Sequence, residues 1–166
     1  WKYAIFVLAF DIFKGWLPTA VYATIIFQQL PVPDQGLVQI LCGFAAVIGH
    51  IFPIFTGFKG GKGVGSLIGV LLALYPLVFP LCLLIGVAVI TTTGYVSLGS
   101  ISAAISLPII ILILPMLGLI SPNLSLMVFI LLVPWLIIFT HRTNINRIRN
   151  GTENRFEKAI ILGKKN

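Results

Sequence analysis

The feature that most constrains this chain is the stretch from Gly63 to His141, which contains no Asp, Glu, Lys or Arg. A helix in a soluble protein needs a polar face toward water, and this stretch offers none. The whole chain is 58% apolar and 9% charged, with a mean hydropathy of +1.09, outside the range of ordinary globular domains. The sequence therefore predicts an all-α polytopic membrane protein, with residues 1–166 forming a single integral membrane domain.

Proline, glycine and polar residues divide the apolar sequence into about six predicted transmembrane helices. The third and fourth meet near Pro76, and because a helix of about 13 residues is only about 20 Å long, their neighbours must shelter them. The predicted spans are 3–28, 37–52, 64–76, 76–90, 101–120 and 124–140. The alternative is one long kinked helix after Val64, with the polar stretch from Thr91 to Ser100 as a buried re-entrant turn, which leaves four spans.

The distribution of charge sets the predicted orientation. The segment from His141 to Asn166 carries four arginines and three lysines against two glutamates, a net charge of +5. By the positive-inside rule this basic tail, which we expect to continue the last helix, lies in the cytoplasm together with the loop that holds Lys59 and Lys62. The loop that holds Asp34 then lies outside.

The sequence GHIFPIFTGFKGGKGVGS, from Gly49 to Ser66, interrupts the apolar segments with glycines and two lysines. Glycine lets the backbone adopt left-handed conformations and approach a ligand closely, and successive amides can form an anion-binding concavity. A helix starting near Val64 adds its positive N-terminal end, and Lys59 and Lys62 supply full charges. This composition predicts a phosphate-binding loop.

The loop does not match the phosphate-binding motifs of soluble enzymes. A Walker A motif requires Gly at the position of Thr56 and Ser or Thr at the position of Gly63, and no GxGxxG pattern can be placed here. The alternative interpretation is a flexible cytoplasmic loop whose lysines only enforce the orientation in the membrane. The concentration of glycine favours phosphate binding.

Asp11 and Lys14 lie three residues apart inside the first predicted span, on one helical face. Ionisable groups within a membrane are costly and often belong to a functional site. A structural pair near the surface, with Lys14 extended toward water, explains the same pattern equally well. We therefore expect replacement of Asp11 to act through folding or loop placement.

The two histidines lie at the ends of predicted spans. A lone histidine such as His50 is more often hydrogen-bonded structure than a catalyst. If the last helix continues past the membrane, His141 and Asn144 share a face with two isoleucines, and Asn150-Gly151 predicts the end of that helix. This face is therefore partly polar and partly apolar.

Three segments resemble the PlsY family of bacterial acyl-phosphate:glycerol-3-phosphate acyltransferases, small polytopic enzymes that begin phospholipid synthesis. They are DIFKGWLP from Asp11 to Pro18, GHIFPIFTGFKGGKGV from Gly49 to Val64, and HRTNINRIRNGTENRF from His141 to Phe156. The segment YVSLGS from Tyr95 to Ser100 gives weaker support. Their order and spacing along the chain make the resemblance specific, with Gly65-Ser66 a departure from the usual Ala-Thr.

The resemblance implies seven helices with the motif loops on the cytoplasmic side. An additional N-terminal helix and an earlier phosphate-binding motif of the GSGN-GATN type, with a nearby arginine, would precede Trp1. We therefore expect this chain to begin partway into a longer protein.

The resemblance also implies roles for individual residues. Lys59, Lys62 and the glycine amides would clamp phosphate, His141 and Asn144 would orient glycerol 3-phosphate or its attacking hydroxyl, and no metal or other cofactor is expected. The implied catalytic residues are Lys62, His141 and Asn144, and the implied substrate-binding residues are His50, Lys59, Gly60, Gly61, Gly63, Ser97, Ser100, Arg142 and Glu153. The sequence alone also allows simpler roles for some of these residues. The serines can form hydrogen bonds between helices, and the arginines can anchor the chain to anionic lipid.

The implied reaction moves a fatty acyl group from acyl phosphate to glycerol 3-phosphate, giving 1-acylglycerol 3-phosphate in the bacterial inner membrane. The expected partners are these two substrates and membrane lipid, without nucleic acid, and the expected state is a monomer. The alternatives are a transporter or channel for a small anionic metabolite, motivated by the proline-broken helices and the cationic gap, and a structural scaffold. Cations at the cytoplasmic edge and the absence of a repeated glycine-lysine stretch favour the enzyme.

Overall fold

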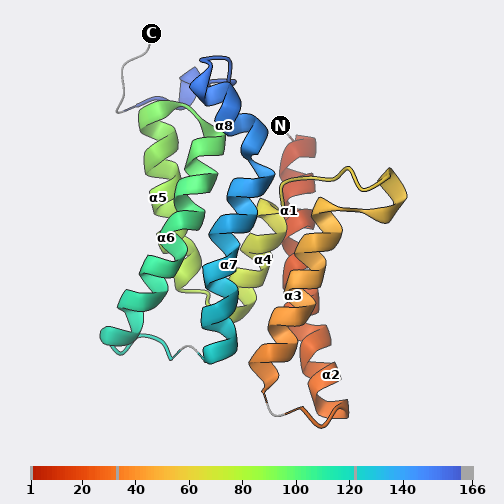
Figure 1. Ribbon diagram of the computed structural model, residues 1–166. Coiled ribbons are helices and arrows are strands. Elements are labelled where there is room, and N and C mark those ends of the chain that lie inside the picture. Colours follow the sequence, from red (N-terminus) through yellow and green to blue (C-terminus); the bar gives the residue numbers. More distant parts are fainter. Residues whose placement is uncertain (1, 33, 122, 162–166) are drawn as a thin grey trace. The chain divides into compact units, whose positions relative to one another are not determined.

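The computed structural model describes residues 2–32, 34–121 and 123–161. Pro33 and Pro122, in two of the predicted turns, and residues 162–166 of the predicted tail lie outside this part of the chain. Within the described residues all regular structure is helical, as Figure 1 shows, which confirms the predicted all-α class. The chain divides into two compact units, Trp1–Phe79 with Asn123–Phe129 and Pro80–Pro122 with Ile130–Asn166.

The first unit opens with a long helical segment in three parts, α1 (Lys2–Leu17), a π-helical turn (Pro18–Tyr22) and α2 (Ala23–Gln29). Pro18 has no N–H and so cannot continue the α-helical hydrogen bonding of α1. The Ala23 N–H donates instead to the carbonyl of Pro18, the five-residue spacing of a π-helix. The widened turn lets the helix continue past the proline, in agreement with the first predicted span.

The helix α3 (Gln35–Ile51) starts at a polar junction. The carboxylate of Asp34 accepts the Gly36 N–H at 2.8 Å, as helix N-cap residues do. The same carboxylate accepts hydrogen bonds from the side chains of Asn123 at 3.1 Å and Ser125 at 2.8 Å, where the last apolar helix begins. One aspartate therefore ties the beginnings of two helices together within the first unit.

The helix α4 (Val64–Leu74) packs against α1 with the two backbones in close contact. A Cβ atom on Gly69 would lie 2.0 Å from the carbonyl oxygen of Ile12, and one on Gly15 would lie 2.0 Å from the carbonyl oxygen of Ser66. Neither position has room for a side chain. These glycines therefore serve helix packing, as small residues commonly do in membrane proteins.

The second unit contains most of two helices and all of two others. In chain order these are α5 (Val78–Thr93), α6 (Val96–Met116), α7 (Leu124–Thr140) and α8 (Arg142–Arg149). Figure 1 shows α5 and α6 running in opposite directions on either side of a short turn. They also approach closely, since a Cβ atom on Gly99 would lie 2.8 Å from the carbonyl oxygen of Gly86.

The predicted polar turn from Thr91 to Ser100 is wrong in its extent. The helix α5 continues to Thr93 and α6 begins at Val96, so that only Gly94, with a φ of 79°, and Tyr95 link them. The hydroxyl of Thr93 donates to a carbonyl one turn earlier in its own helix at 2.7 Å. A threonine whose hydroxyl bonds to its own helix in this way can remain helical. The sequence pattern alone does not show whether a threonine continues a helix or ends it in a turn.

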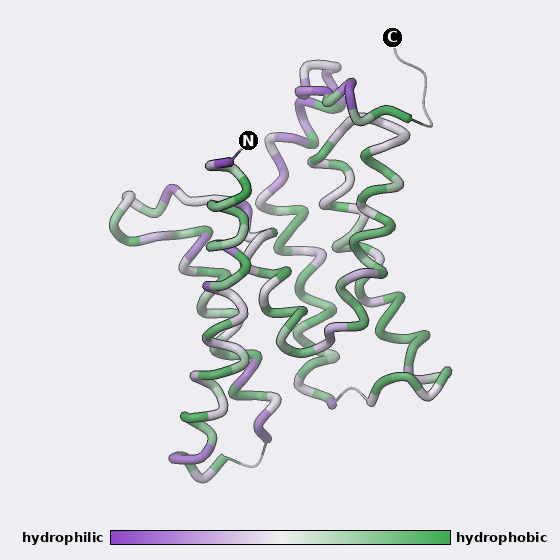
Figure 2. The backbone as a smooth tube through the Cα atoms, turned by 180° about the vertical axis from the view of Figure 1, so that it is seen from behind, coloured by the Kyte–Doolittle hydropathy of each residue, from purple (hydrophilic) through white to green (hydrophobic). Residues whose placement is uncertain are grey.

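Three segments among the described residues are long and apolar enough to cross a membrane, Lys2–Gln29, Gln35–Thr56 and Val96–Met116. The pair α7 and α8, bent by 58°, is a fourth candidate, and α4 and α5 are shorter apolar helices. The end of α4 before Pro76 confirms the predicted break, whereas the count of six spans remains a prediction. Figure 2 shows hydrophobic residues along the helices and hydrophilic ones gathered in α8 and the turn after it.

Candidate functional site

The predicted phosphate-binding loop connects α3 to α4 in the first unit, and Figure 1 shows it projecting from the end of α3. Its residues with positive φ are Gly57 (64°), Phe58 (61°) and Gly63 (81°). Phe58 is unusual, because residues other than glycine rarely adopt this left-handed conformation. Its N–H donates to the carbonyl of Pro53 at 3.0 Å, which closes the turn. Lys59 and Lys62 both lie on the exposed part of the loop.

Two glycine amides of the loop bind the end of α3. The Gly60 N–H donates to the carbonyl of Ile51, and the Gly61 N–H donates to the carbonyl of His50, each at 3.1 Å. They therefore satisfy carbonyls that have no partner within the helix. These amides were predicted from the sequence to face phosphate, and their hydrogen bonds to α3 were not predicted. Amide donors for an anion are instead expected from the first turn of α4, for which Gly63 is the N-cap.

Asp11, on α1, contacts two other candidate residues. Its Oδ1 atom lies 2.5 Å from Nζ of Lys14, which confirms that the two side chains share a helical face. The same oxygen lies 3.4 Å from Nδ1 of His50. The side chains of Asp11 and His50 are only 20% and 13% exposed. The Asp11–Lys14 pair was predictable from its spacing in the sequence, whereas its link to His50 was not, because that link depends on the packing of α1 against α3.

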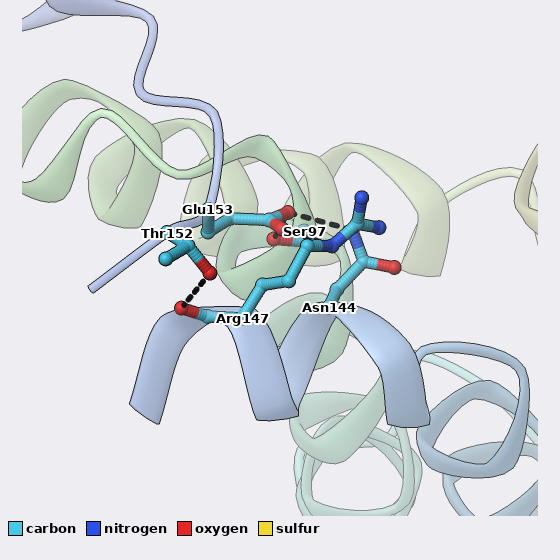
Figure 3. Close-up of polar contacts among 5 residues, drawn as sticks. All are labelled: Ser97, Asn144, Arg147, Thr152 and Glu153. Atoms are coloured by element: carbon cyan, nitrogen blue, oxygen red, sulfur yellow. Dashed lines mark hydrogen bonds and ion pairs between the residues drawn. The ribbon is translucent and has the colours of Figure 1, made fainter. Parts of the chain in front are cut away.

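In the second unit, Ser97, Asn144, Arg147 and Glu153 form a polar group that we call the Asn144 cluster (Figure 3). Glu153 lies at its centre, with a side chain that is 7% exposed. Its Oε1 atom accepts hydrogen bonds from the Ser97 hydroxyl at 2.7 Å and from the Asn144 side-chain amide at 2.6 Å. Its Oε2 atom lies 3.1 Å from Nε of Arg147.

The turn after α8 brings Glu153 back over that helix. Gly151 has a φ of 69°, and its N–H donates to the carbonyl of Ile148 at 3.1 Å, while the Thr152 N–H donates to the carbonyl of Arg147 at 2.8 Å. This pair of hydrogen bonds is a Schellman motif, which confirms the helix end predicted at Asn150-Gly151. The reversal of the chain is the reason that Glu153 can bind Asn144 and Arg147.

The amide of Asn144 is held in one orientation. Its Nδ2 group is bound to Glu153, and Figure 3 shows its oxygen pointing away from that carboxylate. The Oδ1 atom is buried and has no hydrogen-bond partner among the described residues. A buried acceptor without a partner is costly, and such groups are rare in native proteins. Asn144 can accept a hydrogen bond from the hydroxyl group of a ligand.

His141 lies where α7 bends by 58° into α8. The chain changes direction at this residue, and the predicted continuation of the last helix into the basic tail stays a prediction. His141 is 2% exposed, and its Nδ1 lies 2.8 Å from the carbonyl oxygen of Ile137. Because a carbonyl can only accept, Nδ1–H is the donor, and in the neutral ring Nε2 carries the lone pair.

The structure does not bring two of the expected substrate-binding residues into the Asn144 cluster. The Ser100 hydroxyl donates to the carbonyl of Val96 at 3.1 Å. Arg142 donates to the carbonyl of Phe139 at 3.0 Å and stacks 4.5 Å from the centre of its ring. Conversely, the ion pair of Arg147 with Glu153 was not predicted from the sequence. The sequence feature that could have indicated it is Gly151, which predicts a turn between these two residues of opposite charge.

Comparisons with known proteins show the family of the chain. A family model described as glycerol-3-phosphate acyltransferase matches residues 1–151. A glycerol-3-phosphate acyltransferase of Chlorobaculum parvum is 38% identical over 179 residues, which cover 93% of this chain and 75% of the relative. One from Salinibacter ruber is 38% identical over 172 residues, which cover 96% of this chain and 74% of the relative.

Two solved structures are also similar. Both are crystal structures of PlsY (YgiH), an integral membrane glycerol 3-phosphate acyltransferase, one in a lysophosphatidic acid form and one in a glycerol 3-phosphate form. The TM-scores are 0.76 and 0.75, at 35% identity over 93% of this chain and 72% of the solved chains. These matches favour an acyltransferase over the transporter alternative. The chain belongs to the glycerol-3-phosphate acyltransferase family, the family that its three motifs predicted.

Proposed function

We propose that this protein transfers a fatty acyl group from acyl phosphate to glycerol 3-phosphate and produces 1-acylglycerol 3-phosphate. The observation that carries the proposal is the oriented amide of Asn144, whose buried oxygen is an acceptor suited to a substrate hydroxyl. Family membership supports glycerol 3-phosphate as the acyl acceptor. The choice of acyl phosphate as donor follows from the motifs and from the chemistry below.

In this reaction the hydroxyl oxygen of glycerol 3-phosphate attacks the carbonyl carbon of acyl phosphate. A new ester C–O bond forms, the C–O bond to phosphate breaks, and inorganic phosphate leaves with the bonding electrons. Phosphate is a good leaving group, so the protein's main task is to hold two anions together and to orient the hydroxyl. The hydroxyl proton goes to Nε2 of His141 or to an oxygen of a substrate phosphate.

The two groups of candidate residues divide this task. Lys59, Lys62 and the first turn of α4 offer positive charge and amide donors to the phosphoryl groups. Asn144 and His141 orient the attacking hydroxyl, and Glu153 keeps the Asn144 amide in place.

The proposed location is the cytoplasmic membrane of a bacterium, with the C-terminal tail on the cytoplasmic side. Two features support this orientation. The residues after α7 are strongly basic, and Asp34 lies at the start of α3, the end opposite to the glycine-lysine loop. The acyl chain of the donor would remain among apolar helices and lipid. We propose that the monomer is the functional unit.

The direct test is an assay of the purified protein in lipid, with acyl phosphate, acyl-CoA and acyl carrier protein compared as donors. We expect transfer to glycerol 3-phosphate only when acyl phosphate is the donor, with 1-acylglycerol 3-phosphate and inorganic phosphate formed in equal amounts. Transfer only from acyl-CoA would overturn the donor. The absence of transfer from all three donors, together with anion flux in proteoliposomes, would favour the transporter instead.

A further inference from the structure

The glycine-lysine loop is braced from α1 as well as from α3. Asp11 lies beside both ends of the loop. Its Oδ1 is 3.4 Å from Nδ1 of His50, and a Cβ atom added to Gly65 would lie 2.7 Å from Cβ of Asp11. His50 is the penultimate residue of α3 and Gly65 is the second residue of α4. One side chain of α1 thus contacts the last turn before the loop and the first turn after it.

The His50 ring connects Asp11 to the middle of the loop. Its Nδ1 faces Asp11, while its Nε2 faces Gly61 so closely that a Cβ atom on Gly61 would lie 2.0 Å from it. The backbone of His50 makes a second connection, because its carbonyl accepts the Gly61 N–H at 3.1 Å. Both ring nitrogens therefore face groups of the protein, a geometry that favours support over contact with substrate.

Lys14 offsets the negative charge of the Asp11 carboxylate in this half-buried position. Its Nζ lies 2.5 Å from the oxygen that also faces His50. An unpaired carboxylate would be costly here, and the paired one acts as a fixed point for the His50 ring. Since Lys62 follows Gly61 directly, the position of Gly61 sets the starting point of the Lys62 side chain.

We propose that Asp11 and His50 are positioning residues that hold Gly61, and through it Lys62, in the conformation that binds phosphate. They act through the loop and do not touch substrate. The kinetic part of this inference rests on the proposed function, whereas the structural part does not.

The test is a double-mutant cycle between His50→Ala and Gly61→Ala in the full chain. Gly61→Ala alone must displace the His50 ring, so we expect a lower unfolding temperature in detergent. The KM for a phosphorylated substrate should rise about tenfold, with kcat changed less than about threefold. In the His50→Ala background the ring is gone, so adding Gly61→Ala should change neither quantity further. A Gly61→Ala effect of the same size in both backgrounds would overturn the proposal.

The chain supplies a matched control and a charge probe. Gly49 precedes His50 in the same helix, and a Cβ atom there meets nothing within 4 Å, so Gly49→Ala should leave unfolding temperature and KM unchanged. Asp11→Asn keeps the shape but removes the charge, and we expect this variant and His50→Ala alone each to raise the KM for a phosphorylated substrate. If the unmodified protein transfers no acyl group, the proposed function fails, but the unfolding temperatures of the four proteins still test whether the His50 ring supports Gly61.

If Gly61→Ala does not accumulate as folded protein, the double variant tests the same contact. Restored accumulation in the double variant supports the proposal, and continued loss refutes it.

Discussion

Glu153 accepts a hydrogen bond of 2.7 Å from Ser97, a residue 56 positions earlier in the chain. The same oxygen accepts the side-chain amide of Asn144, so one carboxylate connects α6, α8 and the turn that follows α8. Three donors converge on a side chain that is 7% exposed. The geometry of the Asn144 cluster therefore depends on the charge of Glu153.

The substitution Glu153→Gln should separate this charge from the shape of the side chain. An amide in place of the carboxylate can accept through only one oxygen, and the ion pair with Arg147 is lost. We therefore expect kcat/KM to fall about tenfold or more, with a stability loss of about 1–2 kcal/mol. Activity assays and thermal unfolding in detergent measure the two effects. Glu157→Gln, which changes an exposed glutamate nearby, is the control and should leave both unchanged.

Replacement of Asn144 by alanine should reduce turnover about a hundredfold while the protein still inserts and purifies normally. The reason is the loss of the buried oxygen that we propose accepts the substrate hydroxyl. The matched control is Asn146→Ala, because Asn146 lies on the same helix but is exposed. Equal rates for both variants would remove Asn144 from the catalytic group.

Replacement of Lys62 by alanine should raise the KM for a phosphorylated substrate at least tenfold, because the lysine supplies a full positive charge to the phosphoryl group. Lys62→Arg keeps the charge and should recover part of the affinity. Lys158→Ala removes an exposed lysine outside the loop and serves as the control. Steady-state kinetics with each substrate varied in turn would show which phosphate the residue binds.

Alanine substitutions at two glycines should have graded effects on folding. A Cβ atom on Gly69 would lie 2.0 Å from backbone of α1, which cannot move aside, so Gly69→Ala should prevent accumulation of folded protein. A Cβ atom on Gly86 would lie 3.2 Å from the carbonyl oxygen of Gly99. There the gain of about 1 kcal/mol in helix propensity offsets a small displacement. Similar yields for the two variants would contradict the observed packing.

Replacement of Asp34 by alanine should lower stability without changing the chemistry. The variant loses the cap of α3 and the hydrogen bonds from Asn123 and Ser125, which together predict a cost of about 2 kcal/mol. The kcat/KM of the folded fraction should stay within about twofold of the unmodified protein, because Asp34 lies at the opposite end of α3 from His50. A large fall in kcat/KM at unchanged stability would be inconsistent with this role.

The sequence by itself determined the all-α membrane class, the breaks at Pro31 and Pro76, and the family. These depend on composition, on backbone chemistry and on motifs whose residues lie close together in the chain. The end of the last helix was also predictable, since Gly151 is the residue type that the left-handed position after a helix requires.

Only the tertiary structure decided which polar groups meet. The contact of Asp11 with His50 depends on how α1 packs against α3, and the contact of Ser97 with Glu153 depends on how the turn after α8 folds back. It also decided that the amides of Gly60 and Gly61 bind α3 rather than point outward. The physical reason is that such contacts depend on how separate segments of the chain pack together, whereas local sequence preferences depend only on neighbouring residues.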